Sequence, residues 1–421
     1  MKKSILIWSM MAATHAASVS AAGFALAEQS GSGLGNAYAG AAAVAEDAST
    51  IFSNPAGMTY LQGTQFTGAL HAIKPTAQFH DAQSQAAAGG RPLGGEGGDL
   101  GSWALLPNLY YKQDINDSLK WGIGISTPFG LKTEYDKAWL GRFQGIKSEL
   151  KTININPSLA WRVNDKLSLG AGLSAMWAHA ELTSAVNLGG LGESSVRNRG
   201  SDWGFGFNLG SLYQLTPDTR IGLAYRSKVT QHLRGEASSP FTGVNADPNR
   251  TLNTDISAKL TLPETLSISS FSQLDSHWDL LTDITWTRWS RFRELRILRE
   301  NGSGSTLGLT PEYWNDVLRY SAALNYHYSP TVKLRGGLAY DHEAIDHEYR
   351  TVRIPGNDRT WLALGASWQY SAATKLDIGY AHLFIRDAKI NDNQASTGRG
   401  VVNGEFLGDA NILSLQLSHQ F

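Results

Sequence analysis

The feature that most constrains the fold is a series of segments in which apolar and polar residues alternate. In one of them Trp278, Leu280, Ile284 and Trp286 fall on the same face, because side chains two residues apart in a strand point the same way. Fourteen such segments follow residue 63: 64–74, 102–113, 119–129, 149–162, 167–182, 202–214, 219–233, 254–272, 277–294, 314–328, 332–345, 358–370, 374–388 and 410–421. The pattern therefore predicts an even number of strands.

Short and long connections alternate strictly between these segments. Six are tight and rich in Asn, Asp, Pro and Ser: 114–118, 163–166, 215–218, 273–276, 329–331 and 371–373. The others are mostly long, polar and often Gly-rich: 75–101, 130–148, 183–201, 234–253, 295–313, 346–357 and 389–409. A β-sandwich has no reason to place every short turn at one end, whereas an outer-membrane barrel does. We predict an all-β fold, a 14-stranded antiparallel transmembrane β-barrel.

The composition excludes several other classes. The 421 residues carry a net charge of −1 and include no cysteine. A disulfide scaffold, a thiol nucleophile and a Cys-ligated metal site are therefore excluded, and the charge gives no reason to expect nucleic acid. After residue 20 no apolar run reaches the roughly 18 residues of a membrane-spanning helix, which excludes a helical transporter.

The N-terminus has the pattern of a secretory signal. A basic start at 1–3 precedes a mostly apolar stretch at 5–17 and the small residues 19–21. We expect cleavage after Ala21, or else after Ala22, and removal of residues 1–21 on export. The alternative, a single membrane anchor, is disfavoured because the apolar stretch is too short.

Aromatic residues gather near the ends of the alternating segments, at the level where lipid headgroups favour them. They are Trp103, Tyr110, Tyr111, Trp161, Trp177, Trp203, Tyr213, Trp278, Trp286, Trp289, Tyr328, Trp361, Trp368 and Tyr370. The alternative is an aromatic core in a soluble β-protein. The last segment alternates and ends on Phe421, which resembles the C-terminal assembly signal of outer-membrane barrels. We predict a location in the outer membrane of a Gram-negative bacterium.

Residues 22–63 do not alternate and precede the barrel at 64–421. Asn54 followed by Pro55 suits a helix start, because the Asn side chain caps a backbone N–H and Pro fits the first turn. We predict short helices inside the lumen, since a barrel this wide cannot be filled by its own side chains. The alternative is a periplasmic tail.

The stretch 22–40, followed by 45–48 and by Asn54-Pro55-Ala56, resembles the start of the FadL family of outer-membrane long-chain fatty acid transporters. Weaker matches follow at 139–143, 156–160, 203–208 and 262–264. The resemblance implies a monomeric barrel plugged by an N-terminal hatch that includes Asn54, Pro55 and Ala56. It also implies that external loops capture hydrophobic ligands, which reach an internal pocket and leave sideways into the membrane through a kinked third strand.

The third segment ends in residues that pair poorly, because Pro lacks a ladder donor and Gly weakens a strand. The candidate lateral opening is Ser126, Thr127, Pro128, Phe129 and Gly130. The alternative is a strand that simply ends at its outer loop.

The loops at 131–148 and 183–201 hold more apolar side chains than solvated loops need, with Arg197 and Arg199 nearby, as at many binding sites. The candidate groove that receives the hydrophobic ligand comprises Leu131, Trp139, Leu140, Phe143, Val186 and Leu188. The alternative is that the loops pack on one another and close the extracellular end.

A carboxylate ligand requires a cation nearby. His179, Arg226 and Arg319 are candidate headgroup contacts. The position at which the resembled family carries a basic residue near the end of the fifth strand is Ser184 here. That departure favours hydrocarbons or other neutral hydrophobic molecules.

No enzyme motif is complete. Gly33 and Gly35 lack the third glycine of a dinucleotide-binding loop, and His342 and His347 are one residue too far apart for a zinc-protease motif. We expect no catalytic residue, metal or cofactor. The predicted function is passive outer-membrane uptake of long-chain fatty acids or similar molecules, with outer-membrane lipids and lipopolysaccharide as neighbours. The alternatives are hydrocarbon uptake by the same route, a structural or adhesive barrel acting through its loops, and a general porin.

Overall fold

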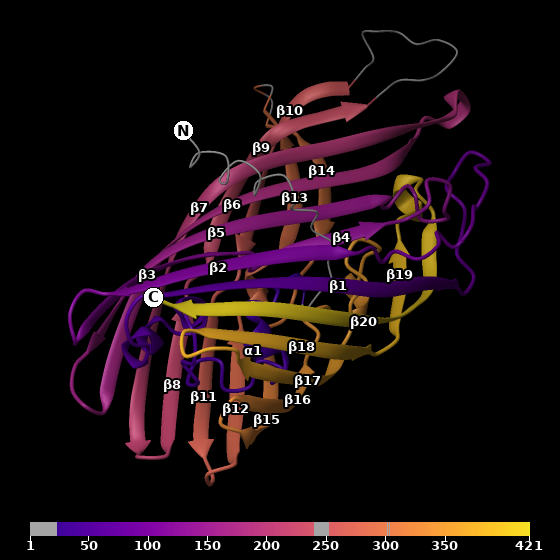
Figure 1. Ribbon diagram of the computed structural model, residues 1–421. Helices are drawn as coiled ribbons and strands as arrows, with labels where there is room; N and C mark the ends of the chain where they lie inside the picture. Colours follow the sequence, from indigo (N-terminus) through magenta and orange to yellow (C-terminus); the bar gives the residue numbers. More distant parts are fainter. Residues whose placement is uncertain (1–22, 240–251, 301, 303) are drawn as a thin grey trace, which may run out of the picture.

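The structure is a computed structural model that describes residues 23–239, 252–300, 302 and 304–421. The expected signal at 1–21 and part of the connection 234–253 lie outside the described residues. The strands form one antiparallel barrel, which is closed because β1 (Gln65–Asp81) pairs with β20 (Val401–Gln420) along its whole length. Figure 1 shows these first and last strands side by side. The prediction of a 14-stranded barrel is confirmed.

Among the described residues, twenty strand segments build the fourteen strands of the wall, because six of these are interrupted and continue as two segments. The interrupted ones are β3/β4, β8/β9, β10/β11, β12/β13, β14/β15 and β18/β19. The bounds not yet given are β2 (Ala104–Asp114), β3 (Leu119–Ser126), β4 (Gly130–Glu134), β5 (Lys147–Arg162), β6 (Leu167–Asn187), β7 (Glu193–Thr216), β8 (Thr219–Arg226), β9 (Val229–Ser239), β10 (Leu252–Leu262), β11 (Thr265–Gln273), β12 (Trp278–Thr287), β13 (Glu294–Arg299), β14 (Thr306–Pro311), β15 (Val317–Ser329), β16 (Val332–Asp341), β17 (Arg359–Gln369), β18 (Thr374–Ile385) and β19 (Ala388–Asn393).

Some outer connections are much shorter than predicted. The expected loop 183–201 is mostly strand, since β6 and β7 pair as far as Asn187 and Glu193. The pattern was missed because the outward-facing side chains of this stretch are mostly polar or charged rather than apolar. Arg199 Nη2, for example, lies 2.6 Å from a carboxylate oxygen of Glu236. Alternation of apolar and polar residues therefore no longer marks the strands where their outward side chains become polar.

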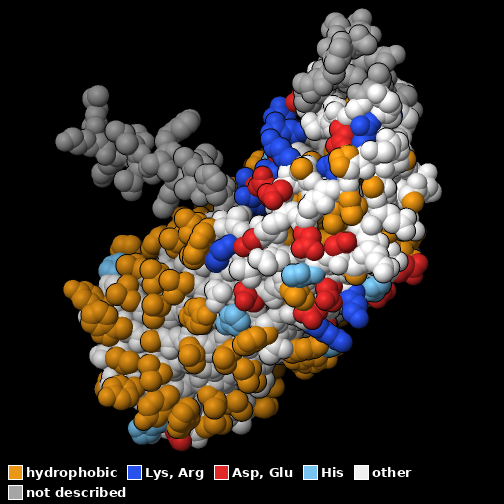
Figure 2. Space-filling view, turned by 90° about the vertical axis from the view of Figure 1, so that its right-hand side faces the viewer, with side chains coloured by type: hydrophobic (Ala, Val, Ile, Leu, Met, Phe, Trp, Pro, Cys, Tyr) orange, Lys and Arg blue, Asp and Glu red, His pale blue; other side chains and the backbone are white. Residues whose placement is uncertain are grey.

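The two faces of the wall differ as the alternation predicts. On β7 the outward Trp203, Phe205 and Phe207 are exposed, and the residues between them face the lumen. In Figure 2 hydrophobic side chains cover one part of the face shown and charged side chains gather on the other. Three aromatic residues expected in the outer belt, Tyr110, Trp289 and Trp361, are instead buried on the lumen side. Sequence position near a segment end did not distinguish the two faces.

Residues 23–63, called the hatch below, lie inside the barrel and touch its wall. Their short helices are α1 (Gly31–Leu34), α2 (Thr50–Ser53) and the 3-10 helix η1 (Pro55–Tyr60). Wall glycines permit the close approach: a Cβ on Gly210 would lie 1.9 Å from Asn54 Oδ1, and one on Gly222 would lie 2.0 Å from the carbonyl oxygen of Ala42. Within the described residues, no helix is long and apolar enough to cross a membrane.

Candidate functional site

The third wall strand is interrupted at the predicted place. β3 ends at Ser126 and β4 begins at Gly130. β2 pairs with β3 only as far as Leu109 opposite Ile125, whereas β4 pairs with β5. The outer half of this strand is therefore not joined to β2, and the break contains Pro128, which has no N–H to donate.

The N-terminal end of the hatch takes the place of the missing neighbour. Leu26 N donates to the carbonyl oxygen of Pro128 at 2.9 Å, and Gly130 N donates to that of Phe24 at 3.0 Å. These two bonds flank an antiparallel bridge between Ala25 and Phe129. The break is thus closed by a segment of the hatch rather than by a wall strand.

The pairing of residues 24–26 with 128–130 is called the seal below. Behind it lies an aromatic cluster of Phe24, Phe129, Trp289, Phe292 and Trp314. The ring centre of Phe24 lies 4.7 Å from Trp289, 5.6 Å from Trp314, 5.8 Å from Phe292 and 6.2 Å from Phe129. All five side chains are at most 5% exposed. The seal is therefore held by apolar packing as well as by backbone hydrogen bonds.

The aromatic cluster belongs to a larger apolar core in the outer part of the lumen. Leu131, Met176, Val229 and Leu262 are among its buried members. Trp289 and Trp314 enter it from 288–293 and 312–316, where two interrupted wall strands leave the ladder. This core has the composition of a site for a hydrophobic molecule, filled here by side chains of the chain itself.

A cavity of about 220 Å³, called the hatch cavity, extends from the seal into the hatch. Its hatch side includes Ala25, Leu26, Phe52 and Pro55, and its wall side includes Pro128, Phe129, Asn208, Leu209, Tyr225, Arg226, Pro263, Thr265 and Arg319. The break in the third strand is thus connected to space inside the hatch.

Two of the three expected headgroup residues face this cavity. Arg226 donates to the carbonyl oxygen of Phe52 and Arg319 to that of Ala37, both at 2.8 Å. Their guanidinium groups hold the hatch in this state. His179 lies on the outward face of β6, stacked on Trp177 and bonded to Ser201 at 2.8 Å, so it does not reach the lumen. The side chain of His179 points away from the lumen because the odd-numbered residues of this part of β6 face outward.

The apolar residues expected in the outer groove are mostly packed away. Trp139, Leu140 and Phe143 are at most 6% exposed and lie in two cores between loops. Leu131 belongs to the apolar core of the lumen, and Val186 and Leu188 are half-buried. In this structure the loops therefore pack on one another, which is the arrangement given above as the alternative to an open groove.

One arginine ties three outer loops together. Arg142 donates through Nε and Nη2 to both carboxylate oxygens of Glu193, at 2.9 and 2.7 Å, and through Nη1 to the carbonyl oxygen of Leu93 at 3.1 Å. The hydrogen bond from Arg142 lowers the pKa of Glu193 below its ordinary value. This clamp keeps the loop cores closed at neutral pH.

The expected hatch motif is built as its residues predict. Asn54 is fully buried and its Oδ1 accepts from Ala56 N at 3.1 Å, which caps η1 with Pro55 in the first turn. Its Nδ2 donates to the carbonyl oxygens of Ala42 and Ser211, at 2.7 and 3.0 Å. Asn54 thus joins two parts of the hatch to β7.

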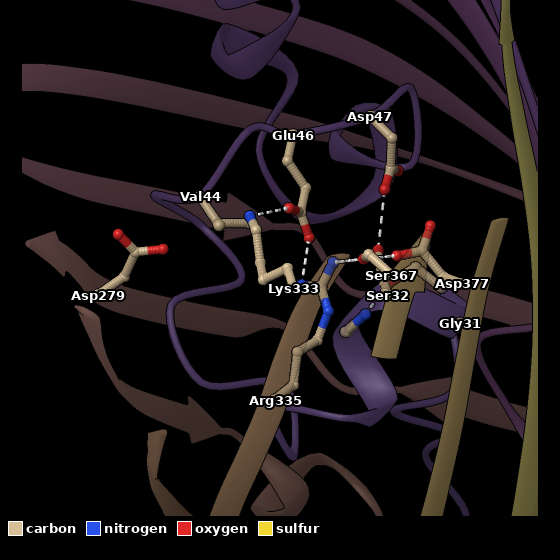
Figure 3. A network of polar contacts seen from close by, with 12 residues as sticks. Gly31, Ser32, Val44, Glu46, Asp47, Asp279, Lys333, Arg335, Ser367 and Asp377 are labelled. Carbon is tan, nitrogen blue, oxygen red and sulfur yellow. Dashed lines mark hydrogen bonds and ion pairs between the residues drawn. The ribbon is translucent and has the colours of Figure 1, made fainter. Parts of the chain in front are cut away.

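A buried ionic network, which sequence reasoning missed, holds another side of the hatch (Figure 3). Glu46 pairs with Arg335 Nη1 at 2.6 Å and with Lys333 Nζ at 3.2 Å. Arg335 also reaches Asp377 at 3.0 Å. Nearby, Asp47 accepts from Ser32 and Gln416, both at 2.8 Å. The partners are far apart in sequence, so no local motif marked them.

Phe24, Trp289, Phe292 and Trp314 were also missed as site residues. Phe24 is the one large aromatic side chain in 22–33, and this isolation was the available signal. Arg353, in the outer connection 342–358, was missed as well. It donates to Ser148 Oγ at 3.0 Å and to the carbonyl oxygen of Thr183 at 3.4 Å, beside Ser184. Burial lowers its pKa to about 10, so it stays cationic at neutral pH.

The closed fourteen-stranded wall, the lumen plugged by its own N-terminal segment and the apolar core above it define a plugged outer-membrane transport barrel. Comparison with known proteins agrees with this class. The chain belongs to the outer membrane protein transport protein family (OMPP1/FadL/TodX), whose model matches residues 12–421. It is a transport protein of the outer membrane, not an enzyme.

Several relatives cover nearly the whole chain. Outer membrane protein P1 of Haemophilus influenzae is 33% identical over 100% of this chain and 99% of that protein. The long-chain fatty acid transport protein of Escherichia coli O6:H1 is 30% identical over 95% of this chain and 94% of that protein. A Pseudomonas aeruginosa FadL homologue shares the fold, with a TM-score of 0.87 and 23% identity over 95% of this chain and all of that one. The Ralstonia pickettii toluene transporter TbuX gives a TM-score of 0.70 at 18% identity over 93% of this chain and 98% of that one.

Proposed function

We propose that this protein carries long-chain fatty acids or similarly hydrophobic molecules across the outer membrane and releases them sideways at residues 126–130. The observation that carries the proposal is the seal, in which hatch residues 24–26 replace β2 as the partner of the broken third strand. An apolar solute gains by leaving into lipid, because each buried CH₂ is worth about 0.8 kcal/mol relative to water.

The route begins at the outer loops and reaches the apolar core of the lumen. Parting of the packed loops around Trp139 and Phe143 opens the way in. A solute that displaces Phe24 from the aromatic cluster frees the N-terminal end of the hatch and uncovers Pro128. The ligand binds where side chains of the chain pack now, so binding and opening are coupled by competition for one space.

For the headgroup of a fatty acid we propose Arg353 as the first cation on this route. It lies next to the apolar core, whose member Ile354 follows it directly, and its partners are carbonyl and hydroxyl oxygens. A carboxylate is a stronger acceptor than these neutral oxygens and would replace them. Arg226 and Arg319 become available deeper in, once the hatch carbonyls that occupy them move.

Hydrocarbon uptake by the same route is the second candidate. The absence of a basic side chain at Ser184 and the aromatic composition of the cluster at Phe24 favour it. The relative that is 30% identical is named for long-chain fatty acids, whereas the toluene transporter is 18% identical and shares the fold alone. Fatty acids are therefore our first choice. We further propose that the barrel acts as a monomer surrounded by outer-membrane lipid and lipopolysaccharide.

The test is to lock the seal. Ala25 and Phe129 form a bridge without hydrogen bonds of its own, and such pairs have Cα atoms about 4.5 Å apart, within disulfide range. The chain has no other cysteine. In cells without their own transporter, the oxidised double variant Ala25→Cys/Phe129→Cys should lose oleate uptake and regain it on reduction.

Two controls make this test specific. The pair Leu338→Cys/Leu362→Cys joins outward residues of β16 and β17 that are already neighbours in the ladder, and its oxidation should leave uptake unchanged. The single variant Phe129→Cys reports the cost of losing that ring. Unchanged oleate uptake in the oxidised Ala25→Cys/Phe129→Cys variant would refute release at this break.

A further inference from the structure

The wall has a second interruption, between β7 and the strand formed by β8 and β9. β7 pairs with β8 from Asn208 opposite Arg226 toward one end, and with β9 from Ser201 opposite Arg234 toward the other. Residues 202–207 of β7 have no ladder partner on this side. The wall therefore lacks backbone pairing between these two strands along residues 202–207 of β7.

One backbone hydrogen bond and two hydrogen bonds to side chains replace the ladder at the two ends of this gap. Ser227 N donates to the carbonyl oxygen of Phe207 at 2.9 Å, and Phe207 N donates to Ser227 Oγ at 2.8 Å. At the other end His232 N donates to Asp202 Oδ2 at 2.6 Å. The neighbouring strand is interrupted at the same height, between β10 and β11, where Pro263 cannot donate. The gap is therefore framed by local bonds and is not restored by the next strand.

Val229, Ser227 and Gln231 fill the gap from the lumen side, and Val229 is the apolar one of the three. Val229 packs on two glycines of β7: a Cβ on Gly204 would lie 2.6 Å from Val229 Cγ1, and one on Gly206 would lie 2.9 Å from Val229 Cγ2. Gln231 Nε2 lies beside Gly204 and Ser227 Oγ beside Gly206. Val229 is 3% exposed and belongs to the apolar core that holds Phe24. Glycines at these two positions leave room for a passage that larger side chains would block.

The membrane side of the gap is apolar, and the lumen side holds Val229 together with the polar Ser227 and Gln231. The hatch cavity borders the gap at Leu209, Tyr225 and Pro263, although the side chains of Leu209 and Tyr225 lie on the outward face of the wall. On the membrane side, Phe205 is 73% exposed and stands between the exposed Trp203 and Phe207. The same cavity therefore reaches the third-strand break at Pro128 and Phe129 and, along another side, the gap between β7 and β9.

We propose that the gap between β7 and β9 is a second lateral passage, gated by Val229, through which compact uncharged apolar molecules such as monoaromatic hydrocarbons leave the lumen for the membrane. The proposal rests on the proposed uptake of hydrophobic molecules. The passage suits compact molecules because three hydrogen bonds close it at both ends, whereas the third-strand break opens when a whole hatch segment withdraws. Lys228, exposed beside Val229, offers an apolar solute no binding partner on the way out.

The experiment locks this passage alone. In the double variant Gly206→Cys/Val229→Cys the two Cβ atoms come within disulfide range, and each single variant is the control for the substitution itself. Labelled toluene and labelled oleate are offered to cells that express the full chain as their only such transporter. Toluene uptake should fall by more than half on oxidation and return on reduction, whereas oleate uptake by the same double variant should be equal in the oxidised and reduced forms. Toluene uptake unchanged by oxidation would overturn the proposal.

A second variant and the seal cross-link separate the possible failures. Val229→Ala shortens the gating side chain and should raise toluene uptake about twofold or more, as expected when a side chain that blocks a passage is removed. No rise would count against gating by Val229. If the Ala25→Cys/Phe129→Cys cross-link leaves oleate uptake intact, release at the third strand fails, and the result for Gly206→Cys/Val229→Cys still decides the second passage.

Discussion

Glu46 of the hatch and Arg335 of β16 form an ion pair with 2.6 Å between Oε1 and Nη1, and the Arg335 side chain is 1% exposed. Arg335 continues to Asp377 of β18. The hatch is thus anchored by charge to β16 and β18. The hatch cavity lies mainly along β7, β8, β11, β12 and β15 and also touches Glu46 and Asp47 of this anchor. On the cavity side Arg226 and Arg319 hold the hatch through its backbone carbonyl oxygens rather than through ion pairs, so we expect the hatch to move there first.

Replacement of Arg335 by Met should release the anchored side. Breaking a buried ion pair costs about 3–5 kcal/mol when the remaining charge is left unpaired. Here Glu46 keeps Lys333 at 3.2 Å and Asp377 keeps Lys375 at 3.8 Å, so we expect a smaller cost. We expect faster hydrogen exchange in peptides from 31–60, with the barrel strands still protected, when exchange is followed by mass spectrometry. The control is Glu236→Gln, which breaks the exposed pair with Arg199 and should change nothing. An unaltered hatch in Arg335→Met would contradict the anchor.

Replacement of Phe24 by Ala should loosen the seal. Phe24 is 2% exposed and touches four aromatic rings, and a Phe→Ala change in such a core costs about 3–5 kcal/mol. The amide of Gly130, which donates to the carbonyl oxygen of Phe24, should lose most of its protection from exchange. Phe24→Leu keeps an apolar side chain and should have a smaller effect. Equal protection of Gly130 in the parent and the Ala variant would show that the ring does not hold the seal.

The barrel could be predicted almost completely from the sequence, and the site only in part. Alternation in segments such as 202–214, together with the rhythm of connections, depends on local order along the chain. The sequence predicted one side of the seal, because Pro128 indicated the break in the third strand. No sequence signal identified Phe24 on the hatch as a residue that closes it. The pairing of Glu46 with Arg335 joins residues 289 positions apart, and charge alone does not select a partner at that distance.

The burial of Trp139 and the outward face of His179 show another limit. Hydrophobicity in a loop predicts that a side chain avoids water, but both an open groove and a packed loop core satisfy it. His179 stands one residue out of phase with Ala178 and Ala180, and a shift of one residue changes the face. Register in the long hairpin of β6 and β7 had to come from the structure.

The clamp between Arg142 and Glu193 should respond to acid in a defined direction. The hydrogen bond lowers the pKa of Glu193 below the ordinary value of 4.5, so the clamp is present above that pH and is lost as the pH falls through the lowered pKa. A spin label on Ala138→Cys, in the exposed part of this loop, should keep its mobility from about pH 8 to about pH 5 and gain mobility only below the ordinary Glu value.

A matched variant separates this clamp from general acid effects. Glu193→Gln removes the charge and should give the mobile spectrum already at neutral pH, because a neutral amide accepts more weakly from the Arg142 guanidinium. A spectrum that stays immobile in Glu193→Gln would show that the clamp does not hold the loop.

Replacement of Arg353 by Met should separate the two candidate substrate classes. Removal of the cation should lower oleate uptake about tenfold, as expected when a charge-assisted hydrogen bond is lost, and leave toluene uptake unchanged. Arg386→Met, at a position 75% exposed on the outside, is the control and should alter neither. Equal effects of Arg353→Met on both solutes would indicate a structural role for Arg353 in the outer loops.

The central claim, release of the ligand at the third strand, is tested most directly by mapping contacts along the route. A photoreactive long-chain fatty acid is taken up by cells that express the full chain, and its attachment sites are read by mass spectrometry after illumination. The account predicts label on 24–26 and 126–131, the two sides of the seal. Label that bypasses these residues and lies along 49–60, at the inner end of the hatch, would contradict it.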